Sequence, residues 1–454
     1  MSSGRAQPEP GLGGGEHAPA RTGATAEVVD LCRDLLRMDT TNTGDTATSA
    51  GERVAAEYVA GKLAEVGLVP EIRESQPGRT SVVARFEGTD PGRGALLVHG
   101  HLDVVPAEPD EWSVHPFSGE IRDGYLWGRG AIDMKDFDAM VLALVRDWRR
   151  RGVRPPRDLV LAFTADEEAG SDLGARFLVR NHPDLLAGCT EAIGEVGGFS
   201  YTMNNDLRLY LVATAEKGVD WLRLRTRGRP GHGSMLHDDN AVTALCEAVA
   251  RVGHHRFPIE VTPTVRAFLE QISELLHIEL DPSDPETAVA KLGPLARLIG
   301  ATIRNTANPT RLAAGYKDNV IPSSATATID CRTLPGHTDT FLSQLREVVG
   351  EEIEIAYIQR QPGIETTFDG ALVDAMAAAL RAEDPGARAV PYMLSAGTDA
   401  KAFTAMGIRC FGFAPLRLPP DLDFAALFHG IDERVPVEGL KFGVRVLDRF
   451  LSQS

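Results

Sequence analysis

The chain has 454 residues, of which 43% are hydrophobic and 24% are charged, and it carries a formal net charge of −17. These values are typical of a globular protein with about two or three domains, and an acidic chain without a basic run is not expected to bind nucleic acid or an anionic membrane. No apolar run is long enough to span a bilayer, and five scattered cysteines without C-x-x-C spacing indicate a reduced, cytoplasmic protein.

Helices and strands alternate along the first part of the chain. Residues 1–24 are rich in Gly, Pro and small polar residues, which predicts a disordered tail. The stretch Ser49-Ala-Gly-Glu52 predicts a capping box that begins a helix. Buried strands are expected over 94–98 and 159–163, with an amphipathic helix over 134–148 between them. This alternation predicts an α/β sheet covered by helices on both faces.

The pattern changes near residue 214 and changes back near residue 363. Between these points, half-exposed strands and two helices predict an antiparallel sheet with helices on one face, interrupted by a mostly helical insertion over 257–308. We therefore expect a mixed-sheet α/β/α domain formed by 25–213 and 363–454, with an inserted α+β domain over 214–362.

The stretch HGHLDVVP, residues 99–106, follows a buried strand and places His99, His101 and Asp103 at alternate positions. Alternate side chains on a strand point the same way, so these three could emerge together at its end. Two interpretations stay open on this motif alone: a metal site, or a hydrogen-bonded cluster beneath a loop.

Four further stretches carry possible metal ligands just after a strand or turn. They are GRGAIDMKD (128–136), TADEEAG (164–170), AIGEVGG (192–198) and FHGIDERVPVEG (428–439). In open α/β sheets, functional groups collect beyond the carboxyl ends of the strands, which predicts that these stretches converge. Adjacent Glu167 and Glu168 would repel each other in an apolar pocket unless a cation lay between them, although acidic residues also favour the start of a helix.

Taken in order, these motifs and the inserted domain resemble the M20 family of metallopeptidases, over nearly the whole chain after the tail. The resemblance implies two divalent ions, with Zn²⁺ favoured and Co²⁺ or Mn²⁺ as options. It implies that His101 and Glu195 hold one ion, that His429 and Glu168 hold the other, and that Asp133 bridges them.

The resemblance also assigns the residues around the ions. Glu167 would be the general base, and Asp103 would fix the His101 imidazole from behind, while His99 is expected to be structural. The family pattern often has glycine after Asp-x-Lys, whereas this chain has Asp136, which is expected to alter the start of the helix without removing a ligand.

The inserted domain resembles the family's lid and dimerisation domain. RGRPGHGSM (227–235) implies that His232 reaches a partner subunit's site in a homodimer and stabilises an oxyanion, although a histidine in a Gly-rich turn is an alternative. Asn319 and Arg332 match positions that grip the substrate, and Gly397 and Thr398 would offer further donors. The alternative for Arg332 is a structural ion pair with a neighbouring acid.

The resemblance implies a hydrolase that cleaves an amide bond beside a free carboxylate, in an N-acyl amino acid or a short peptide, with an activated water as nucleophile. Trp112 and Phe117 would line an apolar acyl pocket or simply pack their loop. The alternatives are a dipeptidase or carboxypeptidase acting on peptides only, and a catalytically dead binding protein of the same fold. An oxidoreductase is disfavoured, because GRGAID lacks G-x-G-x-x-G spacing after a strand.

Overall fold

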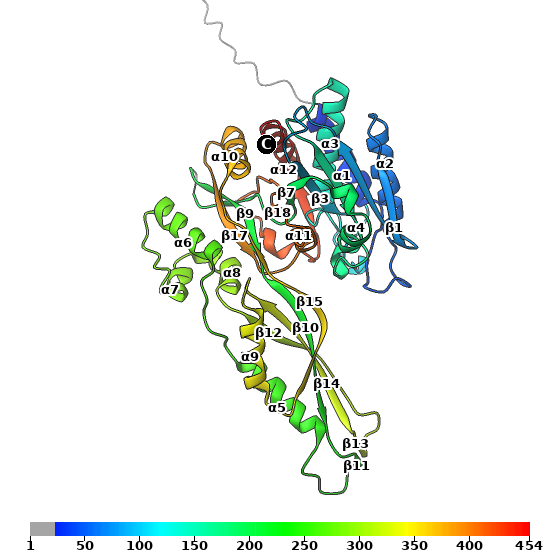
Figure 1. The fold of residues 1–454 in the computed structure, drawn as a ribbon, viewed down its shortest axis with the longest axis vertical. Helices are drawn as coiled ribbons and strands as arrows, with labels where there is room; N and C mark the ends of the chain where they lie inside the picture. The colour runs from blue at the N-terminus through cyan, green and yellow to red at the C-terminus, as the bar shows by residue number, and fades with distance from the viewer. Residues whose placement is uncertain (1–22, 205) are drawn as a thin grey trace, which may run out of the picture.

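A mixed ten-stranded sheet forms the middle layer of the larger part of the molecule in this computed structural model (Figure 1). The strand order is β1 (Glu71–Gln76), β2 (Arg79–Phe86), β6 (Leu159–Thr164), β3 (Ala95–His101), β7 (Cys189–Gly194), β18 (Arg409–Gly412), β9 (Arg208–Glu216) and β16 (Ile364–Glu365), with β8 (Phe199–Thr202) and β17 (Ala387–Leu394) also paired to β9. Strands β6, β3, β7 and β18 are parallel neighbours, so their carboxyl ends meet at one edge.

The structure describes residues 23–204 and 206–454. Residues 1–22 of the predicted tail therefore lie outside the described residues. Helix α1 (Gly23–Leu36) already contains Gly23 and Ala24, so it begins two residues before the predicted start of order. No helix in the described ranges is long and apolar enough to cross a membrane.

Helices cover both faces of the ten-stranded sheet. One face packs against α1, α2 (Arg53–Ala64), α3 (Lys135–Arg151), α10 (Ala371–Glu383) and α12 (Val437–Leu451), and the other packs against α4 (Ala175–Asn181) and α11 (Ala400–Thr404). Alternation along β3 serves both faces, because Leu96 and Val98 join one apolar cluster while Leu97 joins the other. The predicted mixed α/β fold class is confirmed.

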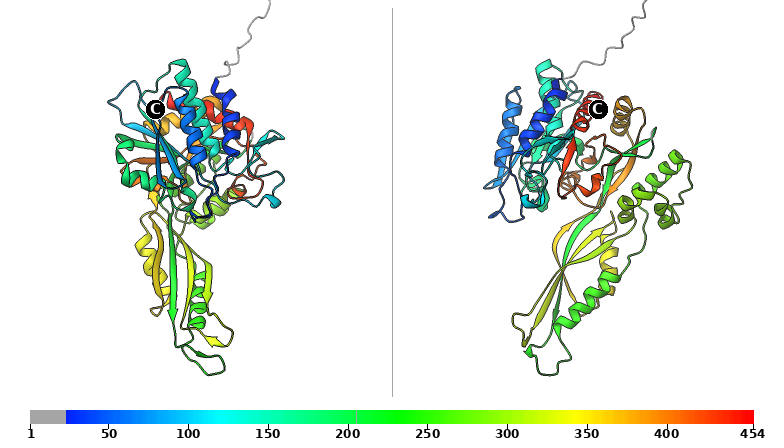
Figure 2. Two further views of the ribbon diagram at one scale, coloured as in Figure 1. Left: turned by 90° about the vertical axis from the view of Figure 1, so that its right-hand side faces the viewer. Right: turned by 180° about the vertical axis from the view of Figure 1, so that it is seen from behind.

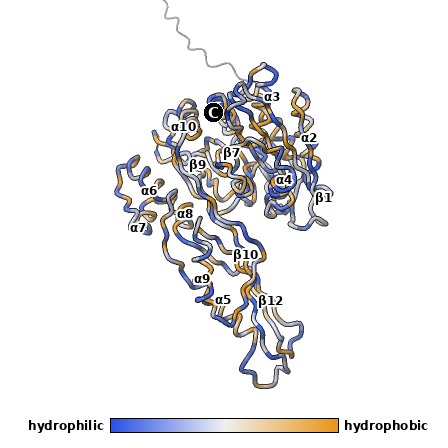
Figure 3. Tube along the Cα trace, viewed as in Figure 1, coloured by the Kyte–Doolittle hydropathy of each residue, from blue (hydrophilic) through white to orange (hydrophobic). Residues whose placement is uncertain are grey.

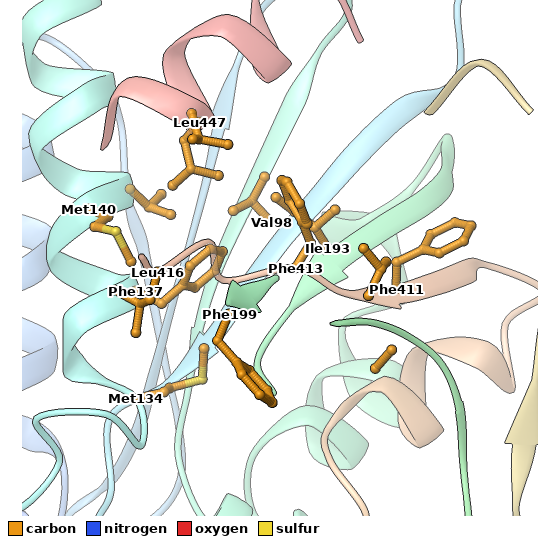
Figure 4. Close-up of a cluster of buried hydrophobic side chains, with 14 of the residues drawn as sticks. Val98, Met134, Phe137, Met140, Ile193, Phe199, Phe411, Phe413, Leu416 and Leu447 are labelled. Atoms are coloured by element: carbon orange, nitrogen blue, oxygen red, sulfur yellow. The ribbon is translucent and has the colours of Figure 1, made fainter. Parts of the chain in front are cut away.

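The larger apolar cluster lies between the sheet and helices α3 and α12. Figure 4 shows Phe137 and Met140 of α3 facing Val98 and Ile193 of the sheet, with Leu447 of α12 above them. Hydrophobic positions gather along the strands inside this part of the molecule (Figure 3). A packed layer of this kind fixes the strand ends from which the candidate site projects.

The inserted part is an elongated arm built on an antiparallel sheet (Figures 1 and 2). Its strand order is β12 (Thr306–Ala314), β14 (Ser324–Thr333), β10 (Gly218–Arg227) and β15 (Glu354–Gln361), and helices α5 (Ala241–His254) and α9 (Thr338–Val349) cover one face. Burial alternates along β14, as expected for a sheet covered on one face only. A short ribbon of β11 (Gly231–His232) and β13 (Val320–Ile321) forms the far end.

The chain passes between the two sheets at two close points. It leaves the larger sheet at Glu216, crosses at Lys217 and enters β10 at Gly218, and it returns between Gln361 and Ile364. These crossings lie close to the domain boundaries predicted near residues 214 and 363.

The helical insertion packs against the larger part and not along the arm. Helices α6 (Pro263–Leu276), α7 (Pro285–Ala290) and α8 (Ala296–Ile299) belong to it, and α6 lies against β17. Buried Phe268 and Leu269 of α6 join the apolar cluster of the larger part. The insertion ends earlier than the predicted residue 308, because β12 already begins at Thr306.

Candidate metal centre

Three adjacent parallel strands deliver acidic residues and a histidine to one edge of the sheet. His101 is the last residue of β3, and its Cα pairs in register with Thr164 at the end of β6. Glu167 and Glu168 follow β6 within one short turn, and Glu195 directly follows β7. Strand order therefore explains why motifs far apart in sequence converge here.

A small antiparallel sheet brings the remaining two motifs to the same place. It pairs β5 (Tyr125–Trp127) with β4 (Glu120–Arg122) on one side and β19 (Arg434–Pro436) on the other. The turn that follows β5 carries Asp133, and the loop that precedes β19 carries His429. This pairing holds two segments that are about 300 residues apart in the chain.

The side chains form two overlapping groups that share Asp133. His101 Nε2 lies 3.0 Å from Asp133 Oδ1 and 3.4 Å from Glu195 Oε2. His429 Nε2 lies 3.3 Å from Asp133 Oδ2 and 3.1 Å from Glu168 Oε2. Each oxygen of the Asp133 carboxylate thus faces a different imidazole, which is the arrangement that a bridging carboxylate requires.

Potential ligand atoms of His101, Asp133 and Glu168 lie within 4.8 Å of one another, and so do those of His101, Glu167 and Glu195. Among the residues that the structure describes, buried Glu168 Oε1 and Glu195 Oε1 find no hydrogen-bond partner. Imidazole and carboxylate together are a donor set that suits Zn²⁺ and related ions. The residues present therefore fit a divalent metal centre.

The imidazoles are held by negative charge. Burial alone would lower the pKa of His101, but the neighbouring Glu195 and Asp133 outweigh it and raise that pKa above its usual value. Hydrogen bonds to Asp133 and Glu168 raise the pKa of His429 to about 10. Both shifts indicate a strongly cation-attracting pocket.

The carboxylates are crowded in low-dielectric surroundings. Burial raises the pKa of Glu195 to about 8, and burial together with the charge of Glu195 raises the pKa of Glu167. The pKa of Glu168 is also raised, first by burial and then by the charge of Asp133. Buried acids in contact are costly unless a cation compensates them, which is a further reason to assign a metal to this cluster.

Asp103 organises the centre through its backbone and its side chain. The carbonyl oxygen of Asp103 accepts a hydrogen bond from His101 Nδ1 at 3.0 Å, which leaves Nε2 free to face the cluster. The Asp103 carboxylate accepts hydrogen bonds from the backbone N–H groups of Glu167 and Glu168, both at 3.1 Å, and from Asn42 Nδ2 at 2.9 Å. Asp103 therefore positions both glutamates as well as the histidine.

His99 is buried away from the cluster. Its ring lies 4.9 Å from the Phe403 ring, and burial lowers the pKa of His99 to about 3. A neutral imidazole packed against an aromatic ring agrees with the structural role expected for it.

His232 and Asn319 lie at the far end of the arm, remote from the metal cluster of the same chain (Figure 1). Both side chains are exposed, and His232 Nδ1 lies 2.8 Å from Ser234 Oγ. The two residues lie side by side, because Gly233 N donates to the Asn319 carbonyl at 2.9 Å. A role for either residue in catalysis therefore requires another copy of the chain.

Arg332 and the loop 395–400 lie at the junction of the two sheets. The Arg332 guanidinium forms a two-bond ion pair with Asp330, at 2.7 and 3.0 Å. This is the structural alternative considered for it, and substrate binding would require a substrate carboxylate to replace Asp330. A Cβ atom at Gly397 would lie 3.1 Å from Val219, whose Cα pairs in register with Arg332.

Thr398 uses both of its donors inside the protein. Its backbone N–H donates to Glu216 Oε2 at 3.0 Å, and its hydroxyl donates to Glu216 Oε1 at 2.5 Å. Lys401 Nζ donates to the same carboxylate at 2.7 Å. In this conformation Thr398 binds Glu216, so its predicted contact with a substrate would require this network to open.

Several residues that position the cluster were not identified from the sequence. Glu433 accepts hydrogen bonds from Arg129 at 2.6 Å and from the backbone N–H groups of Gly130 and Ile132 at 3.1 and 2.8 Å. It thereby shapes the turn that ends at Asp133. Glu433 lies within a motif noted for His429, and its spacing gave no separate signal.

Asp399 is a second buried acid beside the cluster, and it accepts a hydrogen bond from Thr164 at 2.5 Å.

Asp136, the departure from the family pattern, is buried in the first turn of α3, and burial raises its pKa to about 8. Trp112 is largely buried, with the Arg129 guanidinium 5.1 Å from its ring, as expected of a residue that packs its loop.

The chain is similar to several known proteins over most of its length. Aminoacylase-1 of Sus scrofa is 28% identical over 440 residues, which cover 93% of this chain and 94% of that protein. The N-fatty-acyl-amino acid synthase/hydrolase PM20D1 of Xenopus tropicalis is 25% identical over 449 residues, covering 94% and 86%. The crystal structure of the M20 family metallo-carboxypeptidase Sso-CP2 of Sulfolobus solfataricus has a similar fold, with a TM-score of 0.70 at 17% identity, covering 94% and 99%.

The sequence profile of peptidase family M20/M25/M40 matches residues 97–453, which include every histidine and carboxylate of the cluster. The chain therefore belongs to peptidase family M20/M25/M40 and is a metallo-hydrolase.

Proposed function

We propose that this protein is a dinuclear hydrolase that releases an amino acid from an N-acyl amino acid, by cleaving the amide bond beside the free α-carboxylate. The observation that carries the proposal is the shared Asp133, whose two oxygens face His101 and His429 separately. The names of the two relatives, an aminoacylase and an N-fatty-acyl-amino acid synthase/hydrolase, favour an N-acyl amino acid over a peptide.

The five residues proposed to hold the ions are His101, Asp133, Glu168, Glu195 and His429, with Asp133 between the two positions. A pair of divalent ions here, with Zn²⁺ favoured, would activate a water molecule and polarise the amide carbonyl. Glu167 is the proposed general base, because it lies beside His101 and Glu195, while the two histidines pair with Asp133, Glu195 and Glu168.

Glu167 takes the proton of the attacking water as the water oxygen bonds to the carbonyl carbon, and then gives that proton to the leaving nitrogen as the C–N bond breaks. Burial and the charge of Glu195 raise the pKa of Glu167, and a carboxylate with a raised pKa can both accept and return a proton near neutral pH. The products are a free carboxylate and a free amine.

Substrate binding completes the proposal. His232 of the partner in a homodimer donates a hydrogen bond to the developing oxyanion, with Asn319 beside it. Arg332, at the junction of the two sheets, exchanges Asp330 for the α-carboxylate of the substrate. A cytoplasmic setting is part of the proposal, because none of the five cysteines forms a disulfide.

The test is release of free amine from a panel of N-acyl amino acids and dipeptides, with the wild type and Glu167→Gln loaded with Zn²⁺ or Co²⁺. We expect the wild type to hydrolyse N-acyl amino acids and the variant to lose about 10²–10⁴-fold in kcat, because a general base contributes about that much. Hydrolysis of dipeptides alone would make the protein a dipeptidase, and an unchanged rate in Glu167→Gln would refute the role of Glu167.

A further inference from the structure

The far end of the arm exposes large apolar side chains beside His232 and Asn319. We call this region the tip, residues 231–239 and 315–321. Leu236 is 99% exposed, Tyr316 is 84% exposed and Met235 is 66% exposed. The same loops also carry the charged residues Asp238, Asp239, Lys317 and Asp318. An exposed apolar patch with a polar rim marks an interaction site.

Backbone hydrogen bonds join the two loops of the tip. Strands β11 and β13 pair Gly231 with Ile321 and His232 with Val320. The backbone N–H of Met235 donates to the His232 carbonyl at 3.0 Å, which closes a turn over residues 232–235. Met235 and Leu236 therefore follow His232 by three and four residues, at the end of the same turn.

The carboxylates of the metal cluster form their ion pairs with histidines in the described part of the chain. In the part of the chain that the structure describes, no lysine or arginine forms an ion pair with Asp133, Glu167, Glu168 or Glu195. The imidazoles of His101 and His429 face those carboxylates. A side chain that assists the ions by donating a hydrogen bond to the developing oxyanion would therefore come from elsewhere, and the exposed tip of a second copy offers His232.

We propose that Met235, Leu236 and Tyr316 form an apolar wall, supplied by one subunit to the other's centre, that binds a long aliphatic acyl chain of the substrate. This inference rests on the function proposed above. If His232 contacts the oxygen of the scissile carbonyl, side chains one turn away lie beside the groups attached to that carbonyl carbon. An aliphatic chain there would cover surface that is otherwise exposed to water.

The test compares hydrolysis of N-dodecanoyl and N-acetyl derivatives of one amino acid by the wild type and by Met235→Ser/Leu236→Ser. We expect the ratio of kcat/KM for the dodecanoyl to the acetyl substrate to fall by about tenfold or more, since discrimination in apolar pockets is of that size. Tyr316→Ser should lower the same ratio. All three substituted side chains are exposed, so the fold should tolerate the changes.

Val69→Ser is the matched control, because Val69 is 82% exposed and lies on the larger part of the molecule, and it should leave the ratio unchanged. Light scattering at the assay concentration reports the oligomeric state of each variant. An unchanged ratio in the double variant would overturn the inference, as would an equal loss on both substrates with dissociation to monomers, which would mean that the tip only joins the subunits.

The same assay separates this inference from the proposed function. If the wild type hydrolyses N-acyl amino acids and Glu167→Gln does not, while the tip variant keeps its ratio, only the apolar wall is wrong. If the wild type hydrolyses neither substrate, the proposed function fails and the wall fails with it.

Discussion

Two residues outside the proposed ligands, Asp103 and Glu433, support the turns on which the cluster is built. The buried carboxylates of Asp103 and Glu433 accept hydrogen bonds from backbone N–H groups of the turns that carry the proposed ligands and base. A buried acceptor that satisfies several donors is expensive to remove, because each donor then loses its partner in a dry environment. These two acids therefore hold in place the turns that carry Asp133, Glu167 and Glu168.

Glu433→Gln should weaken metal binding without removing a ligand. The amide would place an NH₂ group against Arg129 or against the N–H groups of Gly130 and Ile132, so the turn before Asp133 would shift. We expect metal affinity to fall by about 10- to 100-fold, the usual effect of losing such a supporting contact. Competition with a chromophoric chelator measures it directly.

The control for this change is Glu438→Gln, because Glu438 lies in α12 with its side chain 80% exposed and forms an ion pair with Lys441. It should leave the metal affinity unchanged. Equal affinities for the wild type and Glu433→Gln would show that the turn holds its shape without this carboxylate.

Residues that belong to recognisable motifs could be predicted from the sequence, and their supports could not. His101, Asp133 and His429 follow strand or turn signals, and the structure brings them together. Glu433 and Asp399 were missed because a buried acid acquires its role from the loops that meet around it, and sequence spacing does not reveal which loops meet. Thr398 illustrates the same limit, since its hydroxyl donates to Glu216.

At the scale of elements, the parallel strands position the motifs. The crossing between the two sheets joins the arm to the rest of the molecule. Lys217 is buried at that crossing, and its Nζ donates to the carbonyl oxygens of Ala301 and Arg304 at 2.9 and 2.7 Å. A neutral amine has two hydrogens, which these two carbonyls accept. Lys217 thereby ties the helical insertion to the start of the arm.

The stability of this crossing should depend on pH. Burial, with a contribution from Arg332, lowers the pKa of Lys217 to about 7 from an ordinary value of 10.5. Between those values the unfolded chain binds a proton that the folded chain does not, so the contribution of Lys217 to the free energy of unfolding rises with pH across this window. Below about pH 7 the lysine is charged in both states and its contribution is constant.

Lys217→Met removes the titrating group and isolates this effect. The difference in free energy of unfolding between the wild type and Lys217→Met should grow in favour of the wild type as the pH rises from about 7 to about 10. Urea unfolding of both proteins across this range measures the difference. A difference that stays flat with pH would mean that Lys217 keeps its ordinary pKa in the folded protein.

Element types were predictable where the periodicity was strong, and element ends were less so. The helix before residue 66 was expected to begin with a capping box at Ser49, but α2 begins at Arg53 and its N-cap, Glu52, makes no side-chain cap. The physical reason is competition, because Glu52 binds the buried Arg79 at 2.6 Å while the Ser49 hydroxyl donates to the Asp45 carbonyl. Long-range partners outweighed the local signal.

At the scale of the whole molecule, the length of the inserted sheet separates the larger part of the molecule from the tip of the arm (Figure 2). The sequence suggested an inserted domain but could not say where its helical insertion packs. The structure places α6 on β17 and leaves the arm's outer end uncovered. This division places the candidate metal centre and the exposed His232 at opposite ends of the molecule.

The central proposal is a pair of ions shared through Asp133, and the metal content of the purified protein tests this proposal most directly. After saturation with Zn²⁺ and removal of the excess, elemental analysis should find about two ions per chain in the wild type and in Glu167→Gln, and about one in His429→Ala. One ion or none in the wild type, or full hydrolysis after exhaustive chelation, would contradict a dinuclear metallo-hydrolase.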